Sequence, residues 1–216
     1  MLRSLSSEYV AVDYSPEMVD VCRQAYPGLD VHECDARDLS MFDDETFSLV
    51  IFSLNVIDNL DHESRLAALA EMLRMLRRGD LFVCSTFNRN GPYCHPPLWA
   101  VPITRKGRLR RLLRPFLRPS SSMPRYRRKY QKWRHFRNCE DDHGSWALGL
   151  IFGHVGEFLA HWSLPSTERQ VLGSLGSSVL EFHGPEGQLL TDDVMDSARF
   201  YVLARKGTTS VPGRAP

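Results

Sequence analysis

Two acidic residues near the amino end stand where a nucleoside could be bound. Asp13 follows the apolar run of residues 9–12, and Asp35 follows the short run of residues 29–34. Both runs favour β-strands, so parallel pairing would bring both carboxylates to the carboxyl edge of a sheet. Open α/β sheets bind ligands at that edge, where an acid can accept both hydroxyls of a ribose. Asp13 and Asp35 therefore predict a nucleoside site across two adjacent strand ends.

The segments around these acids alternate between strand and helix signals. Ser15, Pro16 and Glu17 predict a helix that begins at 16 and runs to 25, with a hydroxyl cap, a first-turn proline and a first-turn acid. The apolar run 47–54 predicts a parallel strand covered on both faces. A leucine stripe predicts a helix over 62–77 that is capped by Asp61 and ended by residues 77–79, and 81–87 predict the next strand. This alternation of strands and helices predicts an α/β fold with a doubly wound, mostly parallel sheet.

The second half of the chain has a different composition. Seven prolines interrupt residues 88–138, and the apolar residues 145–162 predict a helix. A further helix is expected over 164–175, with antiparallel strands over 178–183 and 198–206. We therefore expect residues 1–88 to form the cofactor-binding part of one domain and 89–162 a basic, Pro-rich and helical cap insertion after the fifth strand. Residues 163–206 complete the domain, and 207–216 form a disordered tail.

Charge divides the chain unevenly. Its formal net charge is +1, yet residues 81–139 hold 15 Lys and Arg and no acid, which leaves −14 on the remainder. Between Arg105 and Arg137 aromatic side chains recur among these cations, an arrangement that can stack bases while cations meet phosphates. RNA is therefore one candidate partner. The alternative is that the aromatics pack on the domain and the cations form a solvated face.

The five cysteines are odd in number and contain no CxxC pair. This pattern predicts reduced thiols and a cytoplasmic location. The amino end has no signal segment, and no apolar run approaches the length of a membrane span.

Four runs in order, VAVDYSPEMV, ECDARDL, FSLVIFSLNVIDNL and LRMLRRGDLFVCSTFN, resemble the second to fifth strands of class I S-adenosylmethionine-dependent methyltransferases and the helices between them. The resemblance implies a Rossmann-like fold with S-adenosylmethionine as cofactor. It implies that Asp13 holds the ribose, with Tyr14 next to it, and that Asp35 and the backbone of Ala36 read the adenine. It also implies that the turn from Ser53 through Asn55 to Val56 lies beside the sulfonium and the acceptor.

Each of these roles has a structural alternative. Asp13 could cap the following helix, Asp35 could start a turn, and Asn55 could stabilise its loop. Asp58 and Asp61 superficially resemble a metal cluster, as in magnesium-dependent catechol-type methyltransferases, but they follow the wrong strand, so no metal is expected. No catalytic residue is assigned, because methyl transfer relies mainly on positioning. The candidate bases His143, His154 and His161 are each more often packed or surface histidines.

One departure from the family pattern is large. The family has a first strand and a glycine-rich loop before the first segment seen here, whereas this chain has no glycine before Gly28. The family's first strand lies between the second and the fourth, so its absence would leave two apolar strand edges unpaired. The chain then reads either as a truncated enzyme or as a degenerate subunit completed by a chain that supplies the missing strand.

These observations predict an S-adenosylmethionine-dependent methyltransferase with an unidentified acceptor. The charge of the cap favours an anionic acceptor: a small acid, a phosphorylated molecule or RNA. Strand four ends in Ser53-Leu54-Asn55-Val56 and lacks the Asn/Asp-Pro-Pro-aromatic turn, which speaks against exocyclic base amines as acceptors. The alternatives are a non-enzymatic RNA-binding or scaffold module on a degenerate methyltransferase fold, and an inactive fragment.

Overall fold

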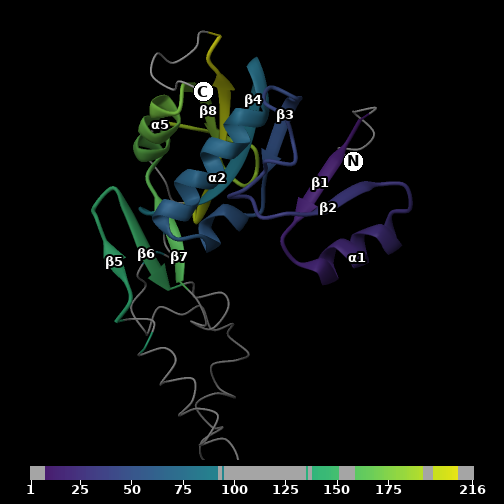
Figure 1. Cartoon of the computed structure of the whole chain (residues 1–216). Helices are drawn as coiled ribbons and strands as arrows, with labels where there is room; N and C mark the ends of the chain where they lie inside the picture. The colour runs from purple at the N-terminus through teal and green to yellow at the C-terminus, as the bar shows by residue number, and fades with distance from the viewer. Residues whose placement is uncertain are drawn as a thin grey trace, which may run out of the picture.

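The computed structural model describes residues 8–91, 138–150, 159–191 and 197–208, together with Cys94 and His135. Helices and strands alternate along the first half of the chain, and strands dominate the second half (Figure 1). The elements are β1 (Val10–Asp13), α1 (Pro16–Ala25), β2 (Asp30–Glu33), β3 (Phe47–Phe52), the short 3-10 helix η2 (Val56–Asn59), α2 (His62–Met75), β4 (Leu76–Asn88), β5 (Asp141–Asp142), β6 (Trp146–Leu150), β7 (Leu159–Ser163), α5 (Pro165–Ser174), β8 (Ser177–His183), β9 (Leu189–Leu190) and β10 (Arg199–Lys206).

The larger sheet is mixed and centres on β4. β3 and β7 pair with β4 in parallel, β10 pairs with it antiparallel, and β8 continues the sheet beyond β10. β6 pairs antiparallel with β7, and the short β5 pairs with β6. The expected antiparallel pair near the carboxyl end is confirmed as β8 and β10.

A break in the sheet separates β1 and β2 from the remaining strands. β1 and β2 form a parallel pair of their own, in which Asp13 is opposite Glu33. Among the described strands β1 pairs only with β2, and β3 pairs only with β4. The prediction that two strand edges lack a partner is therefore confirmed for the described residues. In Figure 1 the unit made of β1, α1 and β2 lies beside β3, apart from the larger sheet.

Exposed apolar side chains gather near this break. Leu49 of β3 is 47% exposed, so the prediction that this strand is covered on both faces is wrong for the described residues. Ten of the twelve large apolar side chains exposed in the described part of the chain lie between residues 9 and 56: Tyr9, Val12, Tyr14, Met18, Val21, Tyr26, Met41, Leu49, Leu54 and Val56. Most of the large apolar side chains that are exposed in the described residues therefore lie in the amino-terminal part of the chain.

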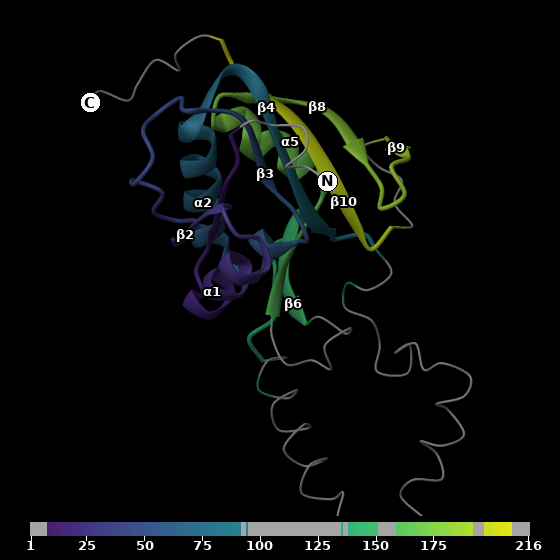
Figure 2. The ribbon, with the colours of Figure 1, turned by 90° about the vertical axis from the view of Figure 1, so that its right-hand side faces the viewer.

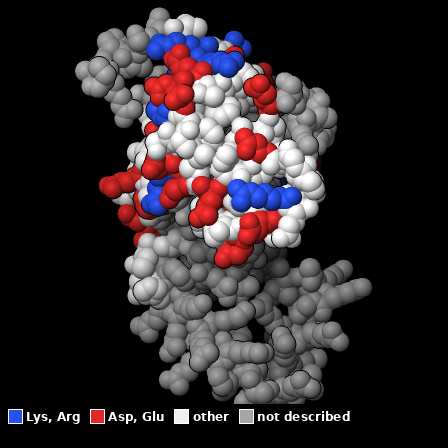
Figure 3. Space-filling view, turned by 45° about the vertical axis from the view of Figure 1, so that its right-hand side comes forward, with Lys and Arg blue, Asp and Glu red and all other residues white. Residues whose placement is uncertain are grey.

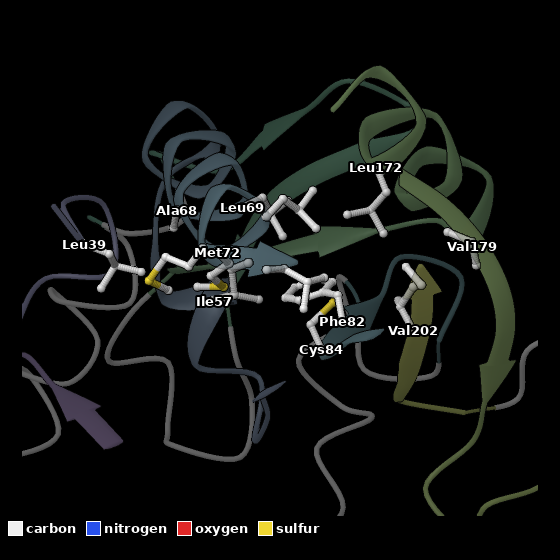
Figure 4. Close-up of a cluster of buried hydrophobic side chains, with 14 of the residues drawn as sticks. Leu39, Ile57, Ala68, Leu69, Met72, Phe82, Cys84, Leu172, Val179 and Val202 are labelled. Atoms are coloured by element: carbon white, nitrogen blue, oxygen red, sulfur yellow. The ribbon is translucent and has the colours of Figure 1, made fainter. Parts of the chain in front are cut away.

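The main core lies between the sheet and the helices α2 and α5. Leu69 of α2 and Leu172 of α5 are buried with Phe82 of β4 and Val202 of β10 in one cluster. Figure 2 shows both helices on one side of β4 and β10, and Figure 4 shows the side chains that meet there. Hydrophobic burial on this one face holds the two helices against the sheet.

Local signals placed α1 and α2 correctly. The Ser15 hydroxyl accepts a hydrogen bond from the backbone of Met18, and the Asp61 carboxylate accepts one from the backbone of Ser64. The end of α2 differs from the prediction. The helix stops at Met75, because Leu76 already has extended backbone and residues 76–80 belong to β4.

The predicted helix over 145–162 is wrong, because its described ends are the strands β6 and β7. In β6 the buried residues alternate, with Ala147 and Gly149 facing inward, and Gly149 lowers helix propensity. β7 is held by the end of β4, where Phe87 is opposite Trp162 and Asn88 opposite Ser163. Tertiary pairing thus overrides the apparent helical stripe.

Several predicted features lie outside the described residues. They include the segment from Arg105 through Arg137, apart from His135, the middle of the predicted cap helix with His154, and the tail beyond Thr208. The proposed domain boundaries stay predictions. None of the described helices is long and apolar enough to cross a membrane.

Candidate functional site

Asp13 lies at the last position of β1, where the sheet edge would meet a ligand. Its Oδ1 accepts a hydrogen bond of 2.8 Å from the backbone N–H of Ser15, and Ser15 in turn caps α1. Its other oxygen, Oδ2, accepts no hydrogen bond from the described residues, and the side chain is half-buried. Asp13 therefore has one oxygen tied to the turn and one available for a hydroxyl donor. Tyr14, the next residue, is 76% exposed.

Asp35 lies two residues beyond the end of β2 and is engaged by its own turn. Both of its carboxylate oxygens accept hydrogen bonds from the Arg37 guanidinium, the shortest being 2.6 Å. This guanidinium, together with the backbone N–H of Arg37, lowers the pKa of Asp35. The backbone N–H of Cys34 donates a hydrogen bond to the backbone carbonyl of Asp13, which holds the ends of the two strands together. The contacts of Asp35 are those of the turn-forming alternative, while Ala36 is half-buried against the main core.

The turn after β3 is strained. Leu54 and Asn55 both have left-handed backbone, with φ of 61° and 57°, which is unfavourable for side chains other than glycine. Asn55 is 4% exposed, its backbone N–H donates to the Ser85 hydroxyl, and its amide donates to Asp58. Asn55 therefore shows the contacts of the loop-stabilising alternative. Leu54 is 74% exposed and Ser53 is exposed, so both line the surface at the carboxyl end of β3.

A buried polar cluster that sequence reasoning missed lies behind this turn. We call Asp58, Arg65 and Glu168 the buried charge cluster; each side chain is at most 1% exposed. Arg65 Nη2 donates to Glu168 Oε1 at 2.9 Å, and Arg65 Nε lies 3.7 Å from Asp58 Oδ1. The cluster joins η2, α2 and α5 at one point. The sequence did carry a signal, because Arg65 lies four residues before Leu69 and seven before Met72 and so shares the buried face of α2.

Asp58 accepts three further hydrogen bonds: from the Thr86 hydroxyl, the Phe87 backbone and the Asn55 amide. Burial raises the pKa of Asp58 to about 7, against the opposing effect of Arg65 and these donors. In the sequence, Asp58 stands out only through its superficial resemblance, with Asp61, to a metal cluster. No group of three or more His, Cys, Asp or Glu side chains in the described part of the chain is arranged to hold a metal ion.

Two of the three candidate histidine bases are described. His161 is buried, and burial together with Arg65 and His62 lowers its pKa to about 2, so it is a poor proton acceptor at neutral pH. His143 is exposed and lies 2.7 Å from Asp141. His62, which the sequence analysis did not consider, lies 3.0 Å from His161 through its Nδ1 atom.

Acidic residues dominate the part of the chain that carries Asp13 and Asp35. From residue 8 to residue 63 there are fourteen Asp and Glu and two basic residues, Arg23 and Arg37. Figure 3 shows several patches of acidic side chains on one face of the molecule, separated by uncharged surface. All five cysteines are free.

Residues 1–79 match the model of a methyltransferase domain. One similar solved structure is the complex between the Trm112 methyltransferase activator of Haloferax volcanii and a methyltransferase. A chain of this complex is 15% identical in sequence to the present chain, with a TM-score of 0.57. The likeness covers 97% of the present chain and 77% of the chain in the complex. An S-adenosylmethionine-dependent methyltransferase of Clostridium acetobutylicum is 11% identical, with a TM-score of 0.53 over 95% of this chain and 78% of that one. No curated protein matches the sequence.

A third structure is the 1,6-didemethyltoxoflavin-N1-methyltransferase of Burkholderia thailandensis, with bound 1,6-didemethyltoxoflavin and S-adenosylhomocysteine. It is 12% identical, with a TM-score of 0.50, and the likeness covers 92% of this chain but only 60% of that one. At such identities the likeness shows the fold. The first 79 residues thus match a methyltransferase domain, and the chain shares the α/β, Rossmann-like fold of these methyltransferase structures.

Proposed function

We propose that this chain binds S-adenosylmethionine at the carboxyl ends of β1, β2 and β3 and transfers its methyl group to a small-molecule acceptor. The observation that carries the proposal is the available Oδ2 of Asp13 at the end of a strand in a parallel pair. A carboxylate at this position can accept the hydroxyls of a ribose. The cofactor, when bound, supplies the activated methyl group, while the chain positions both reactants and excludes water.

We assign the remaining cofactor contacts as follows. Tyr14 covers the nucleoside with its exposed ring. The Arg37 guanidinium occupies both oxygens of Asp35, so the backbone of Ala36 carries the adenine contact while that ion pair is intact. Ser53 and the backbone of Asn55 border the methionine end, because they follow β3 at the same edge of the sheet.

The proposed site needs one more strand. The edges of β1 and β3 lack strand partners among the described residues, and the nearby apolar side chains are exposed. A parallel strand between them would pair both edges and cover this surface. We propose that this strand comes from outside the described residues, either from the same polypeptide or from a second chain.

The first test is calorimetric titration of the chain with S-adenosylhomocysteine. Saturable binding that Asp13→Ala abolishes and Asp20→Ala preserves would support the site, because Asp20 is an exposed acid of α1 that faces no proposed ligand. A folded chain that binds no S-adenosylhomocysteine would contradict cofactor binding by this chain alone.

A second experiment addresses the break in the sheet. Amide hydrogen exchange of β1 and β3 should be fast at positions without a strand partner, and slower once the additional strand is present. Uniformly slow exchange along both strands in the monomeric chain would contradict an open gap between them.

We propose a small anionic molecule as the methyl acceptor. The relative from Burkholderia thailandensis has 1,6-didemethyltoxoflavin bound, which favours a small molecule. The 15 basic residues of segment 81–139 favour an anionic acceptor. The second candidate function, RNA binding between Arg105 and Arg137 without catalysis, rests on that charge alone. Salt-sensitive RNA binding in the absence of S-adenosylhomocysteine binding would select it, and the absence of both would indicate an inactive fragment. A cytoplasmic location stays a prediction.

A further inference from the structure

Four aromatic rings meet where the β6–β7 hairpin contacts the amino end of α2. The imidazole of His62 stacks on the indole of Trp146 with ring centroids 4.0 Å apart and an interplanar angle of 3°. The imidazole of His143 stacks on the same indole, also at 4.0 Å. His62 Nδ1 lies 3.0 Å from His161 Nε2. We call His62, His143, Trp146 and His161 the ring stack.

The ring stack is one of several contacts that hold the hairpin, beside the packing of Trp162 on Phe87 and the hydrogen bond from the backbone of Arg89 to the carbonyl of Ser163. β7 is hydrogen-bonded to β4 over only two residue pairs, Phe87 with Trp162 and Asn88 with Ser163. The carbonyl of Ser145 accepts hydrogen bonds from the backbone of Leu164 and the hydroxyl of Thr167. His62, the first residue of α2, is the residue through which the rings of β6 and β7 contact this helix. A change at His62 or His161 would therefore alter how the hairpin is docked.

The hydrogen bond between His62 and His161 requires at least one neutral ring. One ring nitrogen must donate and the other must accept, so protonating both partners would set two N–H groups against each other. Burial, Arg65 and His62 lower the pKa of His161, and burial, Arg65 and His143 lower that of His62. Glu168 and Asp61 act in the opposite sense on His62 but do not outweigh these effects.

The charges around the pair explain this balance. Arg65 of α2 is the nearby cation, and its guanidinium donates a hydrogen bond to Oε1 of Glu168 on α5. On the hairpin side, His143 is paired with Asp141. A proton on His161 would add a second cation beside Arg65 in a buried site, which is unfavourable.

We propose that the ring stack is an acid-released latch, meaning a contact that docks the β6–β7 hairpin on α2 while His62 and His161 are neutral and frees it when they are protonated. The latch lies next to η2 and the carboxyl end of β4, the edge at which the proposed ligand site is built. Acidification would therefore move the hairpin away from that edge. The inference concerns the docking of the hairpin and does not depend on methyltransferase activity.

The sign and size of the effect follow from proton linkage. A histidine in the released hairpin has its ordinary pKa of about 6.5, whereas docked His161 has one of about 2. Docking is therefore fully favourable above that ordinary value and is progressively lost as the pH falls below it. His161 alone should lower the docking equilibrium about 30-fold between pH 7.5 and pH 5.

The test is amide hydrogen exchange of β6 and β7 at pH 7.5 and pH 5, corrected for the intrinsic effect of pH on exchange. β10 serves as the internal reference for global unfolding. We expect opening of the hairpin to increase about 30-fold at pH 5 while β10 stays protected. His161→Gln, which keeps a neutral hydrogen-bonding group, should lose most of this increase. His183→Gln is the matched control, since His183 lies on β8 away from the ring stack and should leave the increase intact.

Equal hairpin opening at both pH values in the unaltered chain would overturn the proposal, as would a full increase in His161→Gln. Because His161→Gln could misfold, histidine NMR of the unaltered chain gives an independent measurement. His161 should remain neutral down to pH 5 in molecules whose hairpin is protected. Titration of His161 near pH 6.5 in a hairpin that stays protected would also overturn the proposal.

Discussion

Replacing Arg65 by Met should destabilise the fold strongly, because it leaves two buried carboxylates without a cation. Arg65 is 1% exposed and bonds Glu168 at 2.9 Å, with Asp58 at 3.7 Å on its other side. Removing one partner of a buried ion pair costs about 3–5 kcal/mol, a large share of the roughly 5–15 kcal/mol that stabilises a domain of ordinary size.

The measurement is the free energy of unfolding from urea denaturation at pH 8. The matched control is Arg23→Met, which breaks an ion pair of 3.8 Å whose side chains are 54% and 69% exposed. That exposed pair should contribute less than about 1 kcal/mol. Arg23→Met also removes a hydrogen bond to the carbonyl of Val31, so the loss for Arg65→Met must exceed the combined loss of that bond and the exposed pair.

A double variant separates lost pairing from lost packing. In Arg65→Met/Glu168→Met the uncompensated Glu168 charge is gone, so the double variant should be more stable than Arg65→Met alone. Asp58 can take up a proton, since burial raises its pKa to about 7. A loss for Arg65→Met no larger than that for Arg23→Met would refute the argument, because the cluster would then not act as a buried charge system.

Three further variants test other parts of the fold. Burial raises the pKa of Asp58, so the stability that its proton contributes is complete below the ordinary Asp pKa of about 3.9 and is lost as the pH rises through 7. Asp58→Asn should therefore flatten the fall in the free energy of unfolding between pH 5 and pH 8. The control variant Asp20→Asn should leave that fall unchanged. Leu54→Gly should be more stable than Leu54→Ala by about 1 kcal/mol in thermal unfolding, because only glycine relieves the left-handed backbone; equal stability would argue against strain. Leu172→Ala should cost about 2–5 kcal/mol in urea denaturation, and Leu180→Ala, on the exposed side of β8, less than half as much.

The sequence predicted the elements whose signals are local. α1 begins where Ser15, Pro16 and Glu17 predict it, and α2 begins after Asp61, because helix caps act over three or four residues of the same chain. Asp13 is the last residue of β1 and Asp35 follows the end of the neighbouring parallel strand β2, as the strand patterns predict. Their proposed cofactor roles stay predictions.

The described ends of segment 145–162 show where local signals were insufficient. Its apolar residues fit a helical stripe, yet β6 and β7 are strands, because β7 pairs with the end of β4 and β6 pairs with β7. Short apolar runs fit either structure, and the partner strand decides between them.

The amino-acid sequence by itself determined the capped helices, the acids at the strand ends and the uneven distribution of charge, because each of these features depends on residues that are close in sequence. Only the tertiary structure decided that Arg65 meets Glu168, 103 residues away, and that His62 meets His161, 99 residues away. It also decided that β1 and β2 form a sheet of their own. Such contacts depend on which elements are neighbours in space. A buried charge such as that of Arg65 is favourable only when the fold has brought its distant partner beside it, and the same holds for the hydrogen-bonded imidazole of His161.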